Sequence, residues 1–204
     1  MYGKVLQIPQ QETTPFNPVS PYAAAKLYAY YMTKCYREGY GLFATNGILF
    51  NHESPRRGKN FVTMKIINNI KDIVEGKRQY ISLGNLNSKR DWGHAKDYVR
   101  GMWLMLQQDK PDDYVLATGK TYTIKEFVER AFKYKGMNIQ WHGTDLDEVG
   151  IDKNGITRVV VDKKYFRPCE VDLLIGLPTK AEKELGWKRE YDLNKLIIDM
   201  FTDY

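Results

Sequence analysis

Helix-like and strand-like segments alternate along this 204-residue chain, and this alternation constrains its fold more than any other feature. Helices are predicted where apolar residues recur at helical spacing, and strands where short apolar runs lie between turn residues. The predicted helices are residues 22–38, 62–75, 95–107, 123–135, 178–185 and 193–201. The predicted strands are residues 42–50, 80–83, 114–117, 139–141 and 158–161. This order predicts an α/β fold with a mostly parallel sheet.

Two polar segments interrupt the pattern. Residues 51–60 (NHESPRRGKN) are rich in charged and turn-forming residues, and we expect them to form a loop. Residues 145–155 are acidic, and we expect them to be mobile. Glycine is the usual helix stop, so Gly39-Tyr40-Gly41 is expected to end the first helix, and Thr123 is placed to cap the fourth.

The composition excludes several classes of protein. The apolar share of 43% is typical of a globular protein, and no apolar run approaches the ~20 residues that span a bilayer. Cys35 and Cys169 fit no disulfide framework, so we expect free thiols and a reducing, cytoplasmic setting. The net charge of +6 suits phosphate-bearing partners, but the basic residues are scattered. That pattern favours discrete phosphate contacts, and we expect neither a nucleic acid nor a membrane as partner.

The stretch Ser20-Pro21-Tyr22-Ala23-Ala24-Ala25-Lys26 places a tyrosine and a lysine four residues apart at the start of a helix. Residues with this spacing lie on one helical face, one turn apart. A lysine ammonium near a phenol favours the phenolate, which makes tyrosine a usable base at neutral pH. Such a pair suits removal of a proton from a sugar or alcohol hydroxyl while a hydride leaves the carbon.

Spacing alone does not decide the role of Tyr22. With 15 tyrosines in the chain, about one or two Tyr-x-x-x-Lys matches are expected by chance. Tyr30/Lys34 and Tyr191/Lys195 are two more, and we interpret both as ordinary surface pairs. Tyr22 differs because Pro21 precedes it and three alanines give a thin helix face, although a plain first helical turn is the alternative.

No dinucleotide-binding fingerprint is present. Residues 39–44 (GYGLFA) fit G-x-G-x-x-A loosely, but they run from helix to strand, whereas the fingerprint runs from strand to helix. His52, His94 and His142 lie apart and lack the spacing of metal ligands, so no metal site is expected.

Three longer strings carry a family resemblance. They are residues 47–58 (GILFNHESPRRG), residues 83–94 (LGNLNSKRDWGH) and residues 165–172 (YFRPCEVD). Together with Tyr22 and Lys26 they closely resemble the GDP-mannose 4,6-dehydratase family, within the extended short-chain dehydrogenase/reductase superfamily. The resemblance runs over essentially the whole chain.

The resemblance implies a partial Rossmann-like, NAD(P)-binding parallel sheet joined to a small α/β substrate-binding domain. We expect residues 1–60 and 78–120 to form the NADP-binding part, and residues 61–77 and 121–204 to form the part that binds a nucleotide sugar. Family members begin with a strand, a glycine-rich turn and the rest of a nucleotide-binding half, and this chain starts one residue after their catalytic Thr/Ser and Glu. We therefore expect little or no turnover from these 204 residues alone.

The resemblance also implies site residues. Tyr22 corresponds to the catalytic base, and Lys26 to its partner, which also binds the nicotinamide ribose. His52 and Arg57 correspond to NADP contacts. The positions that correspond to substrate contacts are Asn51, Lys65, Arg90, Arg167 and Glu170. The residue types agree, because arginine suits phosphate and ribose oxygens and a carboxylate accepts from sugar hydroxyls.

Each of these positions also has a structural alternative. The Arg56-Arg57 pair could be a solvated loop, His52 could cap a strand end, and Arg90 could pair with Asp91 or with an acidic residue of the surface. Arg167 and Glu170 could form an ion pair of their own, and Lys65 could face solvent.

By resemblance, the expected activity converts GDP-mannose to GDP-4-dehydro-6-deoxy-mannose with recycled NADP, in the synthesis of precursors such as GDP-fucose. The expected assembly is a homo-oligomer, a dimer or a tetramer. Two alternatives stay open: another nucleotide-sugar dehydratase or epimerase, and a truncated, non-catalytic protein that binds a GDP-sugar.

Overall fold

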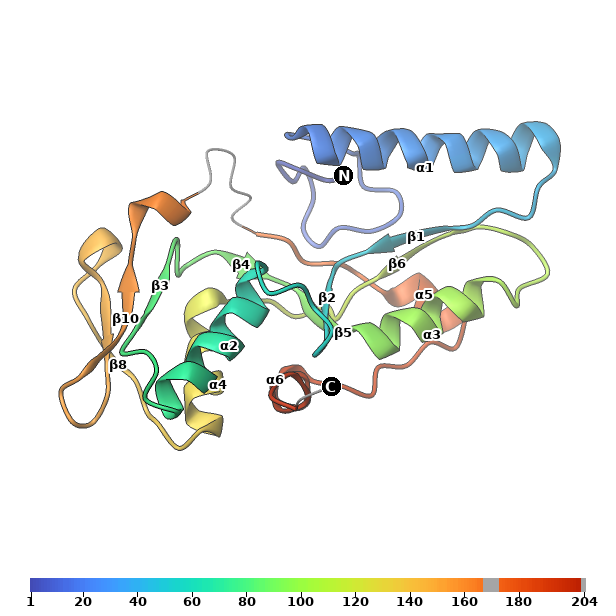
Figure 1. Ribbon diagram of the computed structural model, residues 1–204. Helices are drawn as coiled ribbons and strands as arrows, with labels where there is room; N and C mark the ends of the chain where they lie inside the picture. Colours follow the sequence, from blue (N-terminus) through green and yellow to red (C-terminus); the bar gives the residue numbers. More distant parts are fainter. Residues whose placement is uncertain (167–172, 203–204) are drawn as a thin grey trace. The chain divides into compact units, whose positions relative to one another are not determined.

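The structure is a computed structural model that describes residues 1–166 and 173–202, and its chain divides into two compact units (Figure 1). Each unit is assembled from three segments. Unit 1 comprises Met1–His52, Arg90–Thr121 and Val171–Asp192, and unit 2 comprises Glu53–Lys89, Tyr122–Glu170 and Leu193–Tyr204. These boundaries differ from the predicted domains mainly at residues 53–60, 78–89 and 171–192. The binding roles of the two predicted domains stay predictions.

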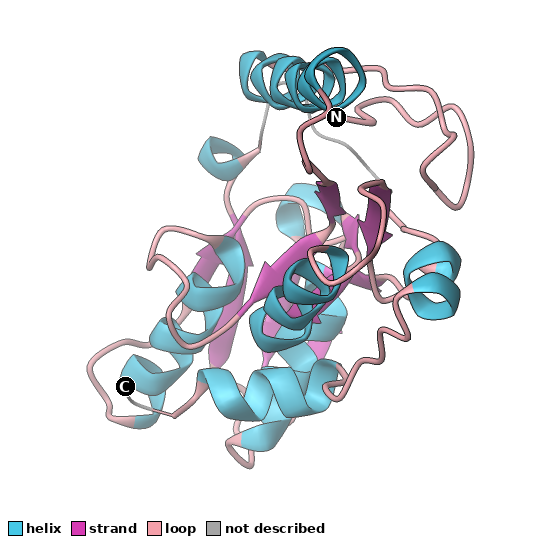
Figure 2. Ribbon diagram, turned by 90° about the vertical axis from the view of Figure 1, so that its right-hand side faces the viewer, coloured by secondary structure: helices cyan, strands magenta, loops and turns pink. Residues whose placement is uncertain are grey.

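Unit 1 is built around a parallel strand pair. Strand β1 (Asn46–Leu49) pairs in parallel with β6 (Asp113–Leu116), so that Asn46 lies opposite Asp113 and Leu49 opposite Leu116. Its helices are α1 (Pro21–Tyr40), α3 (Ala95–Met105) and α5 (Thr179–Glu184), and β5 (Trp92–His94) leads into α3. Figure 1 shows α1 on one side of the β1–β6 pair and α3 with α5 on the other, and Figure 2 keeps α1 above the strands.

Alternation along β6 explains why helices cover both faces of this pair. Successive side chains of a strand point to opposite faces. Tyr114 and Leu116 pack into a cluster with Tyr98 and Trp187, from the α3 side. Val115 belongs to a second cluster, with Tyr30 of α1, Ile48 and Phe50. Both faces of β6 are buried, which is the usual situation in parallel sheets.

Local signals account for the ends of α1. Ser20 has an extended backbone and its hydroxyl accepts a hydrogen bond from the Ala23 N–H, while Pro21 occupies the first turn. Gly41 ends the helix in the left-handed conformation, with φ of 64°, and its N–H bonds the Tyr36 carbonyl. The predicted helix start and its glycine stop are confirmed.

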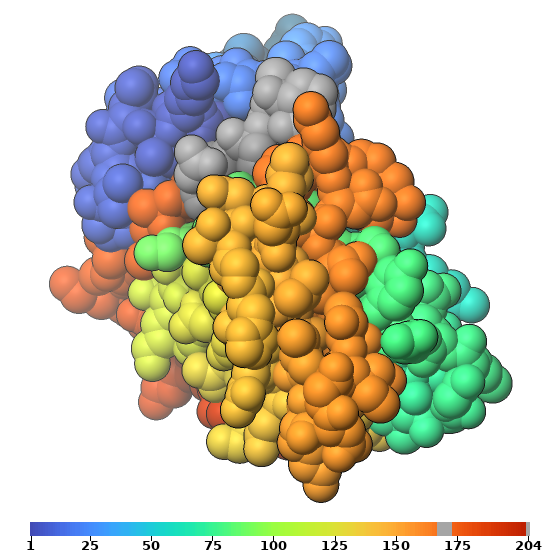
Figure 3. Space-filling view, turned by 90° about the vertical axis from the view of Figure 1, so that its left-hand side faces the viewer, coloured from blue at the N-terminus to red at the C-terminus, as the bar shows by residue number. Residues whose placement is uncertain are grey.

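Unit 2 combines a four-stranded sheet with a cluster of helices. Strand β3 (Ile81–Leu83) pairs in parallel with β10 (Thr157–Val161), and β9 (Val149–Ile151) lies antiparallel between β10 and β8 (Gln140–His142). Figure 3 shows the yellow-to-orange segment that contains β8, β9 and β10 at the surface of the molecule. The remaining elements of unit 2 are α2 (Val62–Val74), β7 (Tyr122–Thr123), α4 (Ile124–Tyr134), η1 (Asp145–Asp147), η2 (Lys163–Tyr165) and α6 (Leu193–Met200).

Helices α2, α4 and α6 pack together through apolar stripes. Ile66, Ile67 and Ile70 of α2 are completely buried, as are Phe127 and Phe132 of α4. Ile66 and Ile67 precede Ile70 by four and three residues, and the buried Val128 precedes Phe132 by four, so each helix turns one apolar face inward.

The α/β fold is confirmed, with corrections in detail. Only residues 46–49 of the predicted strand 42–50 form β1, and the expected loop 51–60 begins with a strand, β2 (Asn51–Glu53). The acidic segment 145–155 contains η1 and β9, which the sequence did not predict, and its expected mobility stays a prediction. A further two-residue strand, β4 (Lys89–Arg90), lies where no strand was predicted. In the part of the chain that the structure describes, no helix is long and apolar enough to span a bilayer.

The start of α4 gives a stability prediction. The Thr123 hydroxyl accepts from the Glu126 N–H at 3.0 Å, and the Glu126 carboxylate accepts from the Thr123 N–H at 2.7 Å, which is a capping box. Thr123→Ala should lower the free energy of unfolding by about 0.5–2 kcal/mol, measured by urea denaturation. Thr123→Ser keeps the hydroxyl and should stay close to wild type. Equal losses in both variants would contradict a capping role.

Candidate functional site

Tyr22 and Lys26 lie together on the first turns of α1. The lysine Nζ is 5.6 Å from the centre of the tyrosine ring, and both side chains are exposed. Tyr22 is 73% exposed, and the spacer of three alanines leaves its helix face thin. The two side chains therefore lie near each other on a surface that a ligand can reach.

Tyr30 is no surface residue, which corrects the sequence interpretation of the Tyr30/Lys34 pair. It is buried, and its hydroxyl donates to Asp113 at 2.8 Å. Burial, and then the Asp113 carboxylate, raise the pKa of Tyr30 well above its ordinary value. Tyr30 is therefore unsuited to act as a base.

His52 lies in β2 beside Asn51, and both are half-buried. The His52 Nδ1 donates to the Phe50 carbonyl at 2.8 Å, since a carbonyl only accepts. Its ring stacks on Tyr98 with 4.8 Å between ring centres. These contacts agree with the structural alternative for His52 and leave Nε2 as the nitrogen that a ligand could use.

Arg90 is half-buried in β4, and its neighbour Asp91 is fully buried. The Asp91 carboxylate accepts N–H bonds from Thr118 at 2.8 Å, Gly119 at 3.0 Å and Gly176 at 3.2 Å. Burial raises the pKa of Asp91, although these bonds act against the shift. Asp91 therefore joins two backbone segments of unit 1, at residues 118–119 and at residue 176, by hydrogen bonds.

Arg57, in unit 2, is held by a neighbouring carboxylate and is not a solvated loop residue. Its Nε lies 3.0 Å from Oε2 of the buried Glu53, and its guanidinium lies over the Phe61 ring, 3.5 Å from the ring centre. Thr63 donates its hydroxyl to the same Glu53 oxygen at 2.7 Å. Burial raises the pKa of Glu53, opposed by the Thr63 hydrogen bond and by Arg57.

Glu53 and Thr63 were missed by the sequence interpretation. No local signal could have found Glu53, because an i, i+4 spacing indicates an ion pair only on a helix and Glu53 ends the strand β2.

Lys65 reaches across unit 2 instead of facing solvent. Its Nζ donates to the Ser82 carbonyl at 2.7 Å and lies over the Tyr165 ring, 3.4 Å from the ring centre. Burial lowers the pKa of Lys65, while Tyr165 acts in the opposite direction. Gly84 also lies close to Tyr165, because a Cβ at this glycine would stand 2.5 Å from the Tyr165 carbonyl oxygen. Lys65 and parts of two of the strings that carry the resemblance thus meet in unit 2.

The two other predicted substrate contacts, Arg167 and Glu170, lie outside the described residues. Across residues 1–166 and 173–202, no group of three or more His, Cys, Asp or Glu side chains could hold a metal ion.

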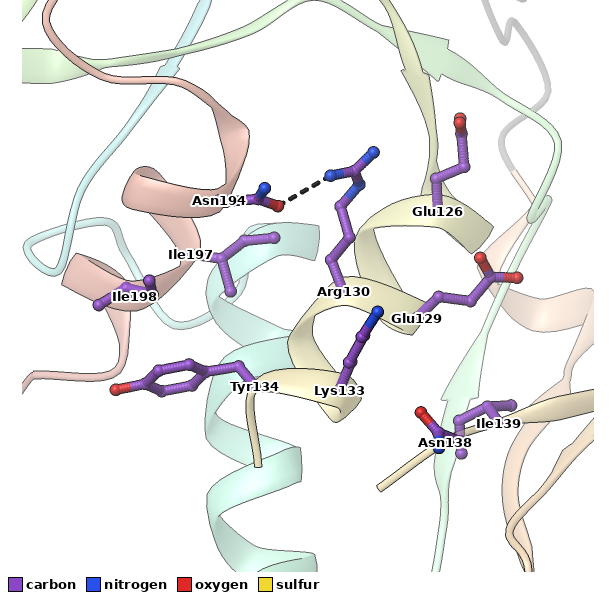
Figure 4. A pocket seen from close by; sticks show the side chains of 10 residues that line it. All are labelled: Glu126, Glu129, Arg130, Lys133, Tyr134, Asn138, Ile139, Asn194, Ile197 and Ile198. Carbon is purple, nitrogen blue, oxygen red and sulfur yellow. Dashed lines mark hydrogen bonds between the residues drawn. The ribbon is translucent and has the colours of Figure 1, made fainter. Parts of the chain in front are cut away.

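A pocket of about 640 Å³ lies between α4 and α6 of unit 2 (Figure 4). Arg130 and Lys133 line it together with Glu126 and Glu129, and Arg130 donates to Asn194 at 2.8 Å. None of the predicted site residues lines this pocket, and its charges are mixed. It is therefore no part of the predicted site.

Comparison with known proteins decides the family. The family model described as GDP-mannose 4,6 dehydratase matches residues 1–200 of the chain. The chain belongs to the GDP-mannose 4,6-dehydratase family. It is 56% identical over 201 residues to the GDP-mannose 4,6 dehydratase of Homo sapiens, covering 98% of this chain and 54% of that protein. The chain is also 56% identical to the GDP-mannose 4,6-dehydratase of Sinorhizobium fredii, and the match covers 100% of this chain and 58% of that protein.

The chain thus spans about half the length of the dehydratase relatives that it matches. Solved structures of lower identity share its fold. The structure of RMD from Pseudomonas aeruginosa complexed with NADPH has a TM-score of 0.80 at 18% identity, covering 98% of this chain and 61% of that chain. The dTDP-glucose 4,6-dehydratase of Bacillus anthracis in complex with NAD has a TM-score of 0.76 at 20% identity, with 98% and 57% covered.

Proposed function

We propose that this chain functions as part of a GDP-mannose 4,6-dehydratase, which converts GDP-mannose to GDP-4-dehydro-6-deoxy-mannose. The observation that carries the proposal is membership of this family over residues 1–200, at 56% identity to dehydratases from human and bacterial sources. The exposed Tyr22–Lys26 pair supports it with a suitable base.

In this proposal Tyr22 accepts the proton of the C4 hydroxyl of mannose. In the same proposal the Lys26 ammonium, 5.6 Å from the centre of the Tyr22 ring, is the partner of the phenol in this step. The thin alanine face between the two residues leaves room for a flat ring next to the phenol. Proton removal at this oxygen prepares C4 for oxidation, the first stage of a 4,6-dehydration.

The proposed cofactor is NADP. When bound, it supplies reversible hydride transfer to and from the sugar. Tyr22, Lys26, His52 and Arg57 would hold it, since the His52 Nε2 can accept a hydrogen bond and the outer edge of Arg57 can bind phosphate oxygens. NADPH and NAD in two proteins of the same fold support a nicotinamide cofactor, and the family resemblance favours NADP.

The proposed substrate contacts are Asn51, Lys65, Arg90, Arg167 and Glu170. Arginine binds diphosphate oxygens in pairs, and lysine adds a point charge. Assembly into a homo-oligomer, a cytoplasmic location, and the absence of nucleic-acid and membrane partners belong to the same proposal.

Calorimetric titration of the purified chain with GDP-mannose, UDP-glucose and dTDP-glucose tests the substrate. GDP-mannose is expected to bind at least tenfold more tightly than the other two nucleotide sugars. A site shaped for its base and sugar loses hydrogen bonds with the others, and a hydrogen bond to a charged group is worth about 1.5–3 kcal/mol. Equal affinities would favour another dehydratase or epimerase of this fold, and no binding at all would contradict the proposal.

Arg90→Gln should weaken GDP-mannose binding about tenfold or more, since it removes one charged hydrogen-bonding group. Arg78→Gln is the matched control, because Arg78 is exposed and its ion pair with Asp72 is long, at 3.8 Å. A similar loss in both variants would show a non-specific effect of charge.

A further inference from the structure

Glu53 is a buried carboxylate, and two residues that follow it within ten positions, Arg57 and Thr63, contact its side chain. The Arg57 N–H bonds the Ser54 carbonyl at 3.0 Å, and the Phe61 N–H bonds the Gly58 carbonyl at 3.1 Å. These two turns precede α2, and Thr63 is its second residue. The backbone therefore brings Arg57 and Thr63 to Glu53, which is only 2% exposed.

The contacts leave the Arg57 side chain little freedom. The Thr63 hydroxyl donates to Glu53 Oε2 at 2.7 Å, and this fixes the carboxylate. The same oxygen lies 3.0 Å from Arg57 Nε, as an ion pair and not as an aligned hydrogen bond. Phe61 covers one face of the guanidinium at 3.5 Å. One edge and one face of the group are thus held.

The other edge of the guanidinium is available to a ligand. Among the described residues, the two terminal nitrogens of Arg57 have no hydrogen-bond partner, and the side chain is 28% exposed. This edge presents N–H groups in one plane, which match two oxygens of a phosphate.

We propose that Glu53, fixed by Thr63, is a positioning residue that aims the outer edge of Arg57 at a phosphate group of the ligand. The proposal rests on the proposed function, in which Arg57 contacts the dinucleotide cofactor. Glu53 touches no ligand itself and acts through Arg57.

The buried carboxylate is not explained by folding alone. Removing a carboxylate from water costs free energy, and an ion pair often fails to recover that cost. The raised pKa of Glu53 shows the same cost, because burial disfavours its charged form. Glu53→Gln keeps the shape of the side chain without the charge, and the fold should tolerate it because the Arg57 side chain, 28% exposed, keeps access to water. Loss of Arg57 order without loss of stability is therefore the signature of positioning.

The test uses the full chain, labelled with ¹⁵N-arginine and studied by NMR. The Nε–Hε signal of Arg57, assigned with Arg57→Gln, should show a rigid side chain in the wild type and a mobile one in Glu53→Gln and Thr63→Val. Thr63→Ser should restore rigidity, because it keeps the hydroxyl. Glu38→Gln, which removes an exposed carboxylate from a 3.8 Å ion pair, is the control. If Glu53→Gln does not fold, Phe61→Leu takes its place in the test. Phe61 is exposed, so the fold should keep this substitution, and the loss of its ring should make the Arg57 guanidinium partly mobile.

Inorganic pyrophosphate and NADPH are then titrated separately. Pyrophosphate should shift the wild-type Arg57 signal, and its dissociation constant should rise about five- to tenfold in Glu53→Gln, because a mobile side chain must be ordered on binding. An Arg57 as rigid in Glu53→Gln as in wild type overturns the proposal, and so does a wild-type signal that pyrophosphate leaves unchanged. A response to pyrophosphate without one to NADPH supports the positioning and rejects the proposed cofactor.

Discussion

Replacing Tyr22 with phenylalanine is expected to lower kcat/KM for GDP-mannose by about 10²–10⁴-fold, the usual contribution of a positioned general base. The measurement needs a complete enzyme. This chain can be joined to the part of the Sinorhizobium fredii relative that lies outside the match, since the two are 56% identical over the matched region. Dehydration of GDP-mannose by the chimera is then followed with and without the substitution.

Tyr28→Phe is the matched control for this experiment. Tyr28 lies on the same helix and is similarly exposed, at 68% against 73% for Tyr22, but Met32 and not a lysine follows it by four residues. Its substitution should leave kcat/KM within about twofold of the unmodified chimera, as expected for a surface position outside the chemistry. A chimera that keeps more than a third of its activity after Tyr22→Phe would rule out Tyr22 as the base.

The parts of the site that could be predicted from sequence are those with local signals. Ser20 and Pro21 fix the start of α1, and this places Tyr22 and Lys26 one turn apart on one face. The capping box at Thr123 is equally local, since both partners lie within four residues. Such signals act between near neighbours, so one sequence is enough to recognise them.

Features set by distant contacts could not be predicted. Tyr30 has the same Tyr-x-x-x-Lys spacing as Tyr22, but it is buried in an apolar cluster and donates to Asp113, 83 residues away. Strand β9 contains only Val149 and Ile151 around a glycine, a signal too short to stand out in an acidic segment, and its pairing with β8 and β10 makes it a strand. Leu42 and Phe43 looked like part of a strand, but they are exposed. Apolar character alone did not indicate burial there.

Within the site, residue types were easier to predict than their partners. The alternative for Arg57, a solvated loop residue, is wrong, because Glu53 and Phe61 hold its guanidinium. The expectation that Lys65 could face solvent is likewise wrong, since Ser82 and Tyr165 engage its ammonium. The ligand roles of both residues stay predictions. The sequence singled out the charged side chains of Arg57 and Lys65, and only the packing of unit 2 shows which residues hold them in place.

Asp113→Ala is expected to lower the free energy of unfolding by about 3–5 kcal/mol, the cost of removing one partner from a buried ion pair. The Asp113 carboxylate accepts from Arg37 at 2.8 and 3.2 Å, from Tyr30 at 2.8 Å and from Asn46 at 2.9 Å. The Arg37 side chain is only 12% exposed, so the substitution leaves its charge buried without this partner. Asp72→Ala breaks an exposed ion pair with Arg78 and should cost less than about 1 kcal/mol in the same urea experiment.

The pH dependence of this loss follows from the pKa of Asp113. Burial acts to raise that pKa, but the bonds from Arg37, Asn46 and Tyr30 outweigh it and hold it below its ordinary value. A lowered pKa in the folded state means that the ionised carboxylate stabilises the fold above the unfolded-state value of about 3.9, and that this contribution disappears as the pH falls through the folded-state value. The difference in unfolding free energy between wild type and Asp113→Ala should therefore be constant near neutral pH and shrink below about pH 4. A difference that stays the same down to pH values well below this would assign the loss to packing and not to the charge of Asp113.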